Sequence, residues 1–465
     1  MNFKILLCLI LNFCIGYTQN KPNVIWLVCE DQSPEFFSIY GNTSVNLPNI
    51  EALRADSVMY NNFYSPSAVC SPSRSAIITG MYPTTIGTHN MRAYNEGRKS
   101  NQPQLNIPSY SPKFPSKIKP FTVALRNTGY YCINSGKEDY NFKISNDAWD
   151  KTCSYCQGKE KSAIHWRYRA KNQPFFAVFN FQITHEAQIW HQAKKSILVD
   201  IDKLKVPPIF PNDSITRKDL AINYSNLIRM DKQLGEIIQQ LKDDGLYKSS
   251  YIFFYSDHGG PFPRYKRAIY ETGTKVPFLV KFPNNKYANT TNNDLLSFID
   301  LAPTMLNIAQ LKVPRYIQGH SFIENQDYIP RKLLFTASDR FDGQFDRIRA
   351  VRGGRYKLIR NYELTKPHAL DVKYRNQMPL MRHLKHLDSL KQLNESQSLW
   401  FNVPKSNFEF YDLINDPYEI NNLINDSFYE NDIKFLQKAL NSWVRKTKDK
   451  GEINEYDLIK SAYIQ

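Results

Sequence analysis

Short apolar runs, separated by longer polar stretches, set the pattern of this chain. The clearest runs cover residues 23–28, 174–180, 251–255 and 278–282, and they are rich in β-branched and aromatic residues. Continuous apolar runs of this length are typical of strands that are buried on both faces of a sheet. We therefore expect these segments, together with residues 129–134, to be buried β-strands.

A helical period dominates residues 215–244. Its apolar positions recur three and four residues apart, and Gly245 follows as a helix stop. This apolar face predicts packing onto a core rather than onto a partner helix. Shorter helices are expected at residues 48–58, 120–128 and 297–306.

The pattern changes near residues 325–332, where the chain becomes polar. Beyond it, residues 348–352 and 356–360 alternate like antiparallel strands, and residues 432–446 have a helical period. The C-terminal part is therefore expected to be a small sheet with a helix packed on it. The predicted organisation is a signal peptide at 1–18, a main α/β domain at 22–325 and a C-terminal α+β subdomain at 326–465.

Polar residues follow three of the predicted strands directly. Glu30 and Asp31 come after residues 23–28, His185 after residues 174–180, and Asp257 and His258 after residues 251–255. Ligands of open α/β sheets bind beyond the carboxyl ends of the strands, so these side chains are placed for chemistry. Adjacent carboxylates there suggest a cation site, and a histidine there can transfer protons.

Residues 70–80 read Cys-Ser-Pro-Ser-Arg-Ser-Ala-Ile-Ile-Thr-Gly. We expect Cys70 to open a helix, because Pro72 suits the first helical turn and needs no hydrogen-bond acceptor there. Arg74 lies one turn further on the same face. The helix N-terminus and the guanidinium would both favour negative charge at residue 70. A buried structural thiol is the alternative interpretation of Cys70.

The spacing C-x-P-S-R-x-x-x-x-T-G resembles the signature of the formylglycine-dependent (type I) sulfatases of the alkaline-phosphatase superfamily. Further segments resemble that family in its own order between Asn23 and Leu423. They are Gly136-Lys137, Thr184-His185, Ser256-Asp257-His258-Gly259, Lys266 to Pro277, and Glu409 to Leu423. In the family, a maturation enzyme oxidises the cysteine to formylglycine, whose hydrated aldehyde is the nucleophile.

The resemblance implies a fold and a set of site residues. The expected fold is α/β, with a large mixed sheet sandwiched by helices and a smaller C-terminal antiparallel-sheet domain that carries a helix. The implied ligands of a calcium ion are Glu30, Asp31, Cys70 as formylglycine, Asp257 and His258. The other implied catalytic residues are Arg74 and Lys137, which neutralise the sulfate, and Lys266 and His185, of which one or the other supports the departing sugar oxygen.

The chain departs from the family pattern at three positions. The family usually has Asp-Asp where this chain has Glu30-Asp31. It has a histidine where this chain has Asp139, and an arginine where this chain has Lys275. The lysine role is therefore carried over to Lys137, while Asp139 is retained only as a substrate-binding candidate.

Other candidates for substrate binding come from less regular segments. His89 and Arg92 follow the reactive helix and could hold an anionic sugar, although a surface histidine is an equal interpretation of His89. Residues 93–119 lack periodicity and are expected to form a long loop that walls the substrate cleft. Candidates from the C-terminal part are Arg340, Asp342, His368, Arg382 and His383.

Charge and leader sequence restrict the partners. The formal net charge is +16, of which residues 1–18 supply only Lys4. That segment, with an apolar run at 5–15, resembles a signal peptide and is too short to span a membrane. A basic exported enzyme suits a polyanion, and since no nucleic-acid-binding motif is recognisable, a sulfated polysaccharide is favoured. We expect a periplasmic or secreted protein.

The number of cysteines is consistent with an unpaired, reactive Cys70. The cysteines beyond the leader are Cys29, Cys70, Cys132, Cys153 and Cys156, an odd number that leaves at least one unpaired. Cys153 and Cys156 have no second cysteine or histidine pair nearby at zinc spacing. A local disulfide or two free thiols is therefore expected for them.

The prediction is an exported sulfatase that hydrolyses sulfate esters of a sulfated polysaccharide or its oligosaccharides, with algal ulvan as the favoured substrate and heparan or aryl sulfates as others. Its implied partners are the sulfated carbohydrate and a formylglycine-generating enzyme. One alternative is a non-catalytic protein that binds sulfated glycans, which would not need the whole residue set. Another is a phosphate-ester hydrolase of the same superfamily, which would need Ser or Thr at residue 70 and usually two metal ions.

Overall fold

The computed structural model describes residues 21–94, 107–154, 162–323 and 327–463. The expected signal peptide, Cys156, the central part of the expected loop at 93–119 and the boundary at residue 325 lie outside the described residues. An eight-stranded mixed sheet forms the centre of the fold, in the order β10-β2-β9-β7-β1-β6-β4-β5. A three-stranded sheet, β11-β3-β8, and a four-stranded sheet, β12-β13-β14-β15, accompany it.

The strands are β1 (Val24–Cys29), β2 (Val58–Tyr60), β3 (Phe63–Tyr64), β4 (Tyr131–Gly136), β5 (Lys151–Ser154), β6 (Phe175–Phe181), β7 (Tyr251–Ser256), β8 (Lys275–Val276), β9 (Phe278–Lys281), β10 (Thr290–Asn292), β11 (Leu296–Ser297), β12 (Leu333–Ser338), β13 (Ile348–Gly353), β14 (Tyr356–Asn361) and β15 (Phe408–Asp412). The α-helices are α1 (Pro48–Ala55), α2 (Cys70–Thr79), α3 (Pro83–Ile86), α4 (Phe121–Asn127), α6 (Ala187–His191), α7 (Ser214–Asp243), α8 (Glu271–Thr274), α9 (Leu301–Ile308), α10 (Pro379–Ser389), α11 (Glu395–Ser398), α12 (Glu430–Thr447) and α13 (Glu455–Tyr463).

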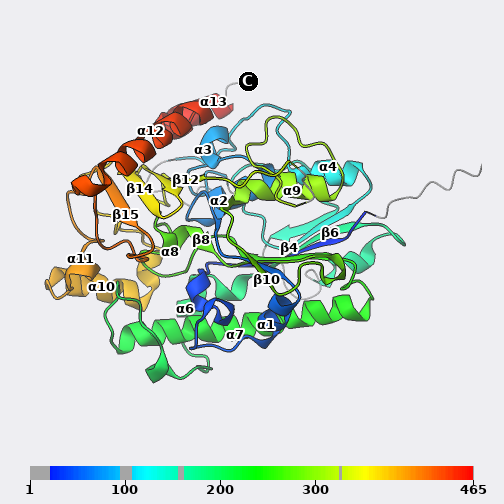
Figure 1. Ribbon diagram of the computed structural model, residues 1–465, viewed down its shortest axis with the longest axis horizontal. Coiled ribbons are helices and arrows are strands. Elements are labelled where there is room, and N and C mark those ends of the chain that lie inside the picture. Colours follow the sequence, from blue (N-terminus) through cyan, green and yellow to red (C-terminus); the bar gives the residue numbers. More distant parts are fainter. Residues whose placement is uncertain (1–20, 95–106, 155–161, 324–326, 464–465) are drawn as a thin grey trace, which may run out of the picture.

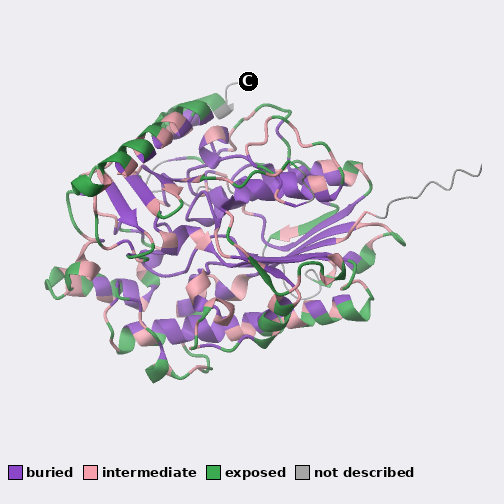
Figure 2. Ribbon diagram, in the orientation of Figure 1, coloured by how far each residue is buried: buried purple, intermediate pink, exposed green. Residues whose placement is uncertain are grey.

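Strand β1 is central because it pairs in parallel with β6 on one side and with β7 on the other. Its residues alternate between two hydrophobic cores: Ile25 and Leu27 pack under α1 and α7, while Trp26 and Val28 pack under α4 and α9. Figure 1 shows these helices on opposite faces of the sheet, and Figure 2 shows the strands buried between them. Burial on both faces explains why these strands are continuously apolar in sequence.

Helix α2 begins at Cys70, as expected, and every one of its residues is buried. It ends at Gly80, whose φ of 69° lies in the left-handed region. A Cβ atom at this position would lie 2.9 Å from the Ile317 side chain, so only glycine fits. The helix is thereby held with its N-terminus toward the carboxyl ends of β1 and β7.

The C-terminal unit is an antiparallel sheet with α12 packed across it, which confirms the predicted sheet and helix. Between β14 and β15 the chain makes a long excursion, residues 362–407, before it returns to the sheet. Helix α10 of this excursion packs against α7 of the main domain. The Leu380 amide donates a hydrogen bond to the Asp219 carboxylate at 2.8 Å.

One predicted helix was too long. Residues 48–58 were expected to be helical, but α1 ends at Ala55 and Val58 begins strand β2. Val58 pairs with Val280 of β9 on one side and Thr290 of β10 on the other. This sheet pairing, which is invisible in the local sequence, overrides the helical spacing.

The described cysteines are of two kinds. Cys29, Cys70 and Cys132 are free and buried, whereas Cys153 is disulfide-bonded. Among the described residues, every helix is too short or too polar to cross a membrane.

Asp219 links the excursion to α7 and gives a prediction for stability. Burial raises the pKa of Asp219 to about 7, so the folded state binds a proton that the unfolded state, with a pKa of about 4, releases. Stability should therefore fall as the pH rises between these two values, by on the order of 2–4 kcal/mol. Asp219→Asn keeps the acceptor for Leu380 and should remove this loss. We expect its advantage in Tm over the wild type to grow from about pH 5 to about pH 8, and a constant difference would contradict the prediction.

Candidate active site

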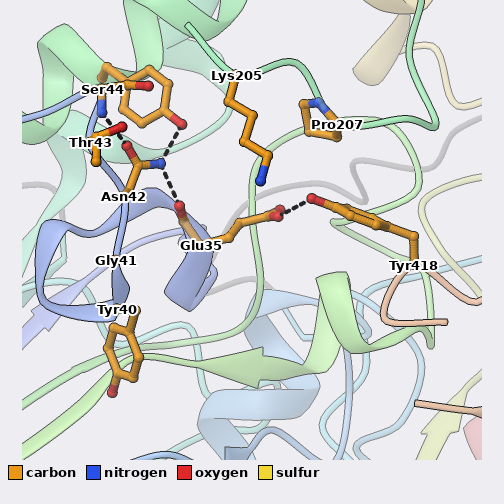
Figure 3. A pocket seen from close by; sticks show the side chains of 10 residues that line it. Glu35, Tyr40, Gly41, Asn42, Thr43, Ser44, Lys205, Pro207 and Tyr418 are labelled. Atoms are coloured by element: carbon orange, nitrogen blue, oxygen red, sulfur yellow. Dashed lines mark hydrogen bonds between the residues drawn. The ribbon is translucent and has the colours of Figure 1, made fainter. Parts of the chain in front are cut away.

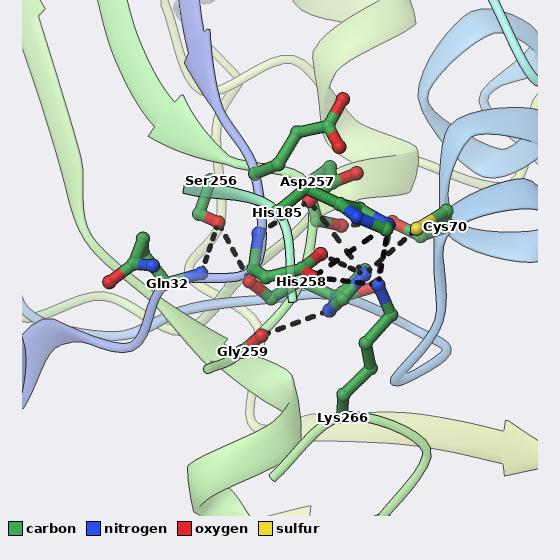
Figure 4. Close-up of polar contacts among 12 residues, drawn as sticks. Gln32, Cys70, His185, Ser256, Asp257, His258, Gly259 and Lys266 are labelled. Carbon is green, nitrogen blue, oxygen red and sulfur yellow. Dashed lines mark hydrogen bonds and ion pairs between the residues drawn. The ribbon is translucent and has the colours of Figure 1, made fainter. Parts of the chain in front are cut away.

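The carboxyl ends of β1 and β7 and the first turn of α2 meet at one buried cluster. Ligand atoms of Asp31, Cys70, Asp257 and His258 all lie within 4.8 Å of one another. All four residues are buried. Figure 4 shows Cys70 approaching the adjacent Asp257 and His258 from another segment, with Lys266 extending toward the same centre. The sequence-predicted ligands are thus brought together, apart from Glu30.

Parallel pairing fixes the two loops that carry the carboxylates. The Asp257 amide donates to the Cys29 carbonyl at 3.2 Å, and the Asp31 amide donates to Asp257 Oδ1 at 3.1 Å. Asp31 has a φ of 55°, an uncommon conformation for aspartate. Backbone strain of this kind persists where surrounding contacts over-determine it, which is common at functional sites.

Cys70 and His258 are in direct contact. Cys70 Sγ lies 3.2 Å from His258 Nε2, and His258 Nε2 lies 3.1 Å from Asp31 Oδ1. His258 Nδ1 lies 2.9 Å from the Gly259 carbonyl oxygen, to which it donates, so that Nε2 faces the cluster. Burial would lower the pKa of His258, but the nearby Asp257, Cys70 and Asp31 outweigh it and raise this pKa to about 10. The cluster therefore favours a positive charge at its centre.

Arg74 reaches the cluster from the second turn of α2. Its guanidinium donates to Asp257 Oδ2 at 3.0 Å, Asn180 Oδ1 at 2.8 Å and Glu30 Oε1 at 3.4 Å. Burial opposes the charge of Arg74, but the carboxylates of Asp257 and Glu30 raise its pKa above the ordinary value. Asn180, at the end of β6, also donates to Asn134 Oδ1 at 2.9 Å.

Lys137 lies on the opposite side of Glu30. Its Nζ donates to Glu30 Oε2 at 3.0 Å and lies 3.8 Å from Asp139 Oδ2. Asp139 in turn accepts a hydrogen bond from the Ser71 hydroxyl at 2.5 Å. Glu30 thus pairs with Lys137 and Arg74. Its carboxylate is not part of the cluster around Cys70, but it lies within 4.8 Å of ligand atoms of Asp31 and His185. Its assignment as a metal ligand stays a prediction.

Lys266 and His185 form the remaining side of the site. Lys266 Nζ donates to Asp31 Oδ2 at 2.7 Å and lies 3.2 Å from His185 Nε2. Burial, with the charge of Lys266, holds the pKa of His185 well below its ordinary value, so His185 is neutral near pH 7. His185 has an exposed side-chain fraction of 14%, against 1% for Lys266 and 0% for Asp31.

Sequence reasoning missed two residues of this network, Glu186 and Arg267. Glu186 accepts bidentate hydrogen bonds from Arg267 at 2.7 and 2.9 Å and lies 3.2 Å from Lys266 Nζ. The Glu186 amide also donates to Asp31 Oδ2 at 2.7 Å. Both residues directly follow predicted site residues, His185 and Lys266, and that adjacency is the signal that could have found them.

The predicted substrate residues are placed differently from one another. Arg340 is buried, and its guanidinium donates to both Glu455 oxygens at 2.6 and 2.7 Å. His89 is also buried, where burial lowers its pKa, and Asp339 and Arg349 are among the charges that act on it. Arg92 is half-buried, and Met91 before it packs in one cluster with Leu370 and Val372. Substrate binding by these residues and by Asp139 stays a prediction.

The C-terminal candidates also have internal partners. Asp342 lies 3.7 Å from Arg267, and His368 Nε2 lies 2.9 Å from Glu409. His383 Nε2 lies 2.6 Å from Asp213 Oδ2. Arg382 donates to the carbonyls of Asn376 and Gln377. Of these four, only Asp342 contacts the network of the cluster directly in the described structure.

A cavity of about 260 Å³ lies outside the cluster. Figure 3 shows the Glu35 carboxylate in its wall, held by the Tyr418 hydroxyl at 2.7 Å, with the Lys205 side chain extending beside it. Tyr265 also donates to Glu35. None of the lining residues belongs to the cysteine-centred cluster, so this cavity is separate from the candidate chemistry.

Comparisons with known proteins agree with this geometry. The sequence model of the sulfatase family matches residues 22–311, and that of the C-terminal part of N-sulphoglucosamine sulphohydrolase matches residues 262–381. An ulvan-active sulfatase of Formosa agariphila is 37% identical to this chain, over 95% of this chain and 78% of the relative. Human N-sulphoglucosamine sulphohydrolase is 23% identical, over 95% and 94% of the two chains.

Solved structures support the fold. A protein in complex with its substrate D-glucosamine-2-N,6-O-disulfate superposes with a TM-score of 0.64 at 17% identity, over 93% of this chain and all of that one. The α/β architecture with its smaller C-terminal sheet is therefore confirmed. Because the family model covers more than half of the chain and the aligned relative nearly all of it, this protein belongs to the sulfatase family and is a sulfuric ester hydrolase.

Proposed function

We propose that this sulfatase hydrolyses sulfate esters of a sulfated polysaccharide or its oligosaccharides, with formylglycine at residue 70 and a calcium ion. The observation that carries the proposal is the position of Cys70. It opens α2 inside a buried cluster with Asp31, Asp257 and His258. Formylglycine at this position would supply, as its hydrate, the oxygen nucleophile that attacks the sulfur of the ester.

The residues present fit a bound cation. Asp31 Oδ1 is buried and accepts no well-aligned hydrogen bond among the described residues; it faces His258 Nε2 at 3.1 Å, and a bound cation would give this oxygen a full partner. Burial would raise the pKa of Asp257, but nearby positive charges hold it at about 2, so it is ionised. Two carboxylates are ligands that calcium prefers, and an oxygen at residue 70 would suit it better than sulfur. Bound there, calcium would withdraw electron density from the sulfate oxygens.

The chain's own cations complete the sulfate site. Arg74 and Lys137 flank the cluster, and each is held by carboxylates at distances of 3.0–3.4 Å. A guanidinium and an ammonium can neutralise the oxygens of a sulfate group. Lys266, 3.2 Å from His185 Nε2, is placed to protonate or stabilise the departing alcohol oxygen, directly or through His185.

Several observations support an acidic carbohydrate as substrate. The net charge of +16 attracts polyanions, and the 37% identical relative is described as ulvan-active. Export, which the sequence of residues 1–18 supports, would place the enzyme with extracellular polysaccharides. The complete set of Cys70, Arg74, Lys137, His185 and Lys266 around one centre weighs against a protein that only binds glycans.

The nucleophile gives the first test. Cys70→Ala should abolish sulfate release from ulvan, carrageenan and heparan-type oligosaccharides, because the methyl side chain of alanine has no thiol that a maturation enzyme could convert to formylglycine. Cys132→Ala is the matched control and should retain turnover. It changes a buried free thiol in the core under α4 and α9, outside the cluster around Cys70. Mass spectrometry of the residue-70 peptide reports maturation. An active, folded Cys70→Ala protein would refute the proposal.

Lys266 can be tested through the leaving group. Lys266→Met should lower kcat for a sugar sulfate by roughly 10²–10⁴-fold, since alkoxide departure needs a proton. The loss for 4-nitrophenyl sulfate should be much smaller, because nitrophenolate leaves without one. Equal losses on both substrates would mean that Lys266 acts on the sulfate or on Asp31 instead.

Calcium binding predicts a change in stability that does not depend on turnover. With calcium at about 100 times its Kd, the native state should gain about 2.7 kcal/mol. Removal of the ion by a chelator should therefore lower Tm by a few degrees, and added calcium should restore it. Asp257→Asn should lose most of this response, while Asp56→Asn, which lies outside the cluster, should keep it. A wild-type Tm that is the same with and without calcium would contradict the proposed calcium site.

A further inference from the structure

Among the described residues, solvent reaches the edge of the buried network at His185, at Asp139 and at Asp342, which lies 3.7 Å from Arg267. The exposed side-chain fraction is 14% for His185 and 10% for Asp139, against 6% or less for Arg74, Lys137, Lys266 and Asp257. His185 is the most exposed of the catalytic candidates, so we consider the approach of a substrate past His185. On that approach, the residues beside His185 would contact the part of the substrate that lies next to the sulfate ester.

Two aromatic side chains stand beside His185. The ring of Tyr374 lies 6.4 Å from that of His185, and the ring of Trp190 lies 5.4 Å from that of Tyr374 at an interplanar angle of 76°. Both aromatic residues are half-buried, so each keeps part of its ring in solvent. Trp190 belongs to α6, a helix that begins two residues after His185. Tyr374 comes from the excursion between β14 and β15.

The excursion that carries Tyr374 is firmly anchored. Leu370 and Val372 pack in one buried cluster with Val69, Cys70 and Met91, and Tyr374 packs against it. The next residue, Arg375, is buried, with its guanidinium 4.7 Å from the ring of Trp400 and bonded to the Leu370 carbonyl. The aromatic pair is therefore held in place before a ligand arrives, which lowers the entropic cost of binding.

Arg92 adds a positive charge to this side. It has a φ of 52°, and its backbone is fixed by hydrogen bonds on both sides, from the Met91 amide to the Arg340 carbonyl and from the Tyr110 amide to the Ala93 carbonyl. Asp31, Asp139 and Arg267 of the site share this left-handed conformation. Met91, the residue before Arg92, packs in the same buried cluster as Leu370 and Val372, and Tyr374 packs against that cluster, so the backbone of Arg92 lies on the Tyr374 side of the site.

We infer that Tyr374, Trp190 and Arg92 form a binding subsite for the sugar next to the sulfated one, and that this sugar carries an anionic group. Aromatic ring faces pack against the C–H faces of pyranose rings, while the Tyr374 hydroxyl and the Arg92 guanidinium offer donors to hydroxyl and acidic groups. The inference rests on the proposed function, since it concerns the same substrate. Its anionic group is either a uronic acid carboxylate or a second sulfate.

The first experiment compares two substrates. One is a sulfated oligosaccharide with a uronic acid next to the sulfated sugar, and the other is 4-nitrophenyl sulfate, which has no second sugar. Tyr374→Ala and Trp190→Ala should each lower the ratio of kcat/KM for the oligosaccharide to that for the aryl ester by about tenfold, through KM, as expected for lost uniform binding. Tyr168→Ala is the matched control, because its exposed ring contacts Lys151 away from the site. An unchanged ratio would overturn the inference.

Arg92→Gln identifies the anionic group. With Arg229→Gln as the control on α7, the loss of kcat/KM should disappear when the carboxylate of the neighbouring sugar is reduced to an alcohol, or when its second sulfate is removed. Whichever change abolishes the effect names the group. A loss that persists after both changes would show that Arg92 does not bind an anion there.

A binding measurement separates this inference from the proposed function. In the Cys70→Ala background, calorimetry with the same oligosaccharide reports affinity without turnover. Tyr374→Ala should raise Kd by about tenfold there as well. If the wild type released no sulfate but Kd still rose, the subsite would stand while the proposed function failed. An unchanged Kd would overturn the subsite even if the wild type were an active sulfatase.

Discussion

The balance of buried charge at the carboxyl end of the sheet is the constraint on which the rest of this structure depends. Four carboxylates and four cationic side chains are buried around one centre: Glu30, Asp31, Glu186 and Asp257 against Arg74, Lys137, Lys266 and Arg267. Each buried charge costs several kcal/mol of desolvation unless it is paired, so these groups can exist only as a network. The carboxylates of Asp31 and Asp257, beside His258, favour positive charge at the centre of this network.

Two hydrophobic cores keep this network in register. Neighbouring residues of β1 point into opposite cores, so the strand cannot slip without exposing one set of side chains. The parallel register with β6 and β7 then fixes where Asp31, His185 and Asp257 emerge. Helix α2 adds Cys70 and Arg74 from one side because its C-terminus is fixed at Gly80. The rigid scaffold thus fixes the distances between the buried charged side chains, and these distances determine how well the charges are paired.

The sequence allowed the strands and the centre of the site to be predicted because both leave local signals. Apolar runs followed at once by Glu30-Asp31, His185 and Asp257-His258 place these residues at one sheet edge. The spacing around Cys70 added the reactive helix. Pairings between distant segments leave no such signal. Arg340 looked available for substrate, yet Glu455, more than a hundred residues later, binds it in a buried ion pair. The sheet pairing that ends α1 early is of the same kind.

The same limit explains why Tyr374 escaped sequence reasoning. The charged and polar residues His368, Arg382 and His383 are the candidates that the sequence of the excursion suggests. In the structure they bind Glu409, the Asn376 carbonyl and Asp213. The residues that matter there are apolar: Leu370 and Val372 pack against Cys70 and carry Tyr374 to the side of His185. The candidate chemistry is therefore built on strand ends, while the inferred contacts to the neighbouring sugar combine Tyr374 of the C-terminal unit with Trp190 and Arg92 of the main domain. Such a division lets the excursion change substrate preference while the charge network stays intact.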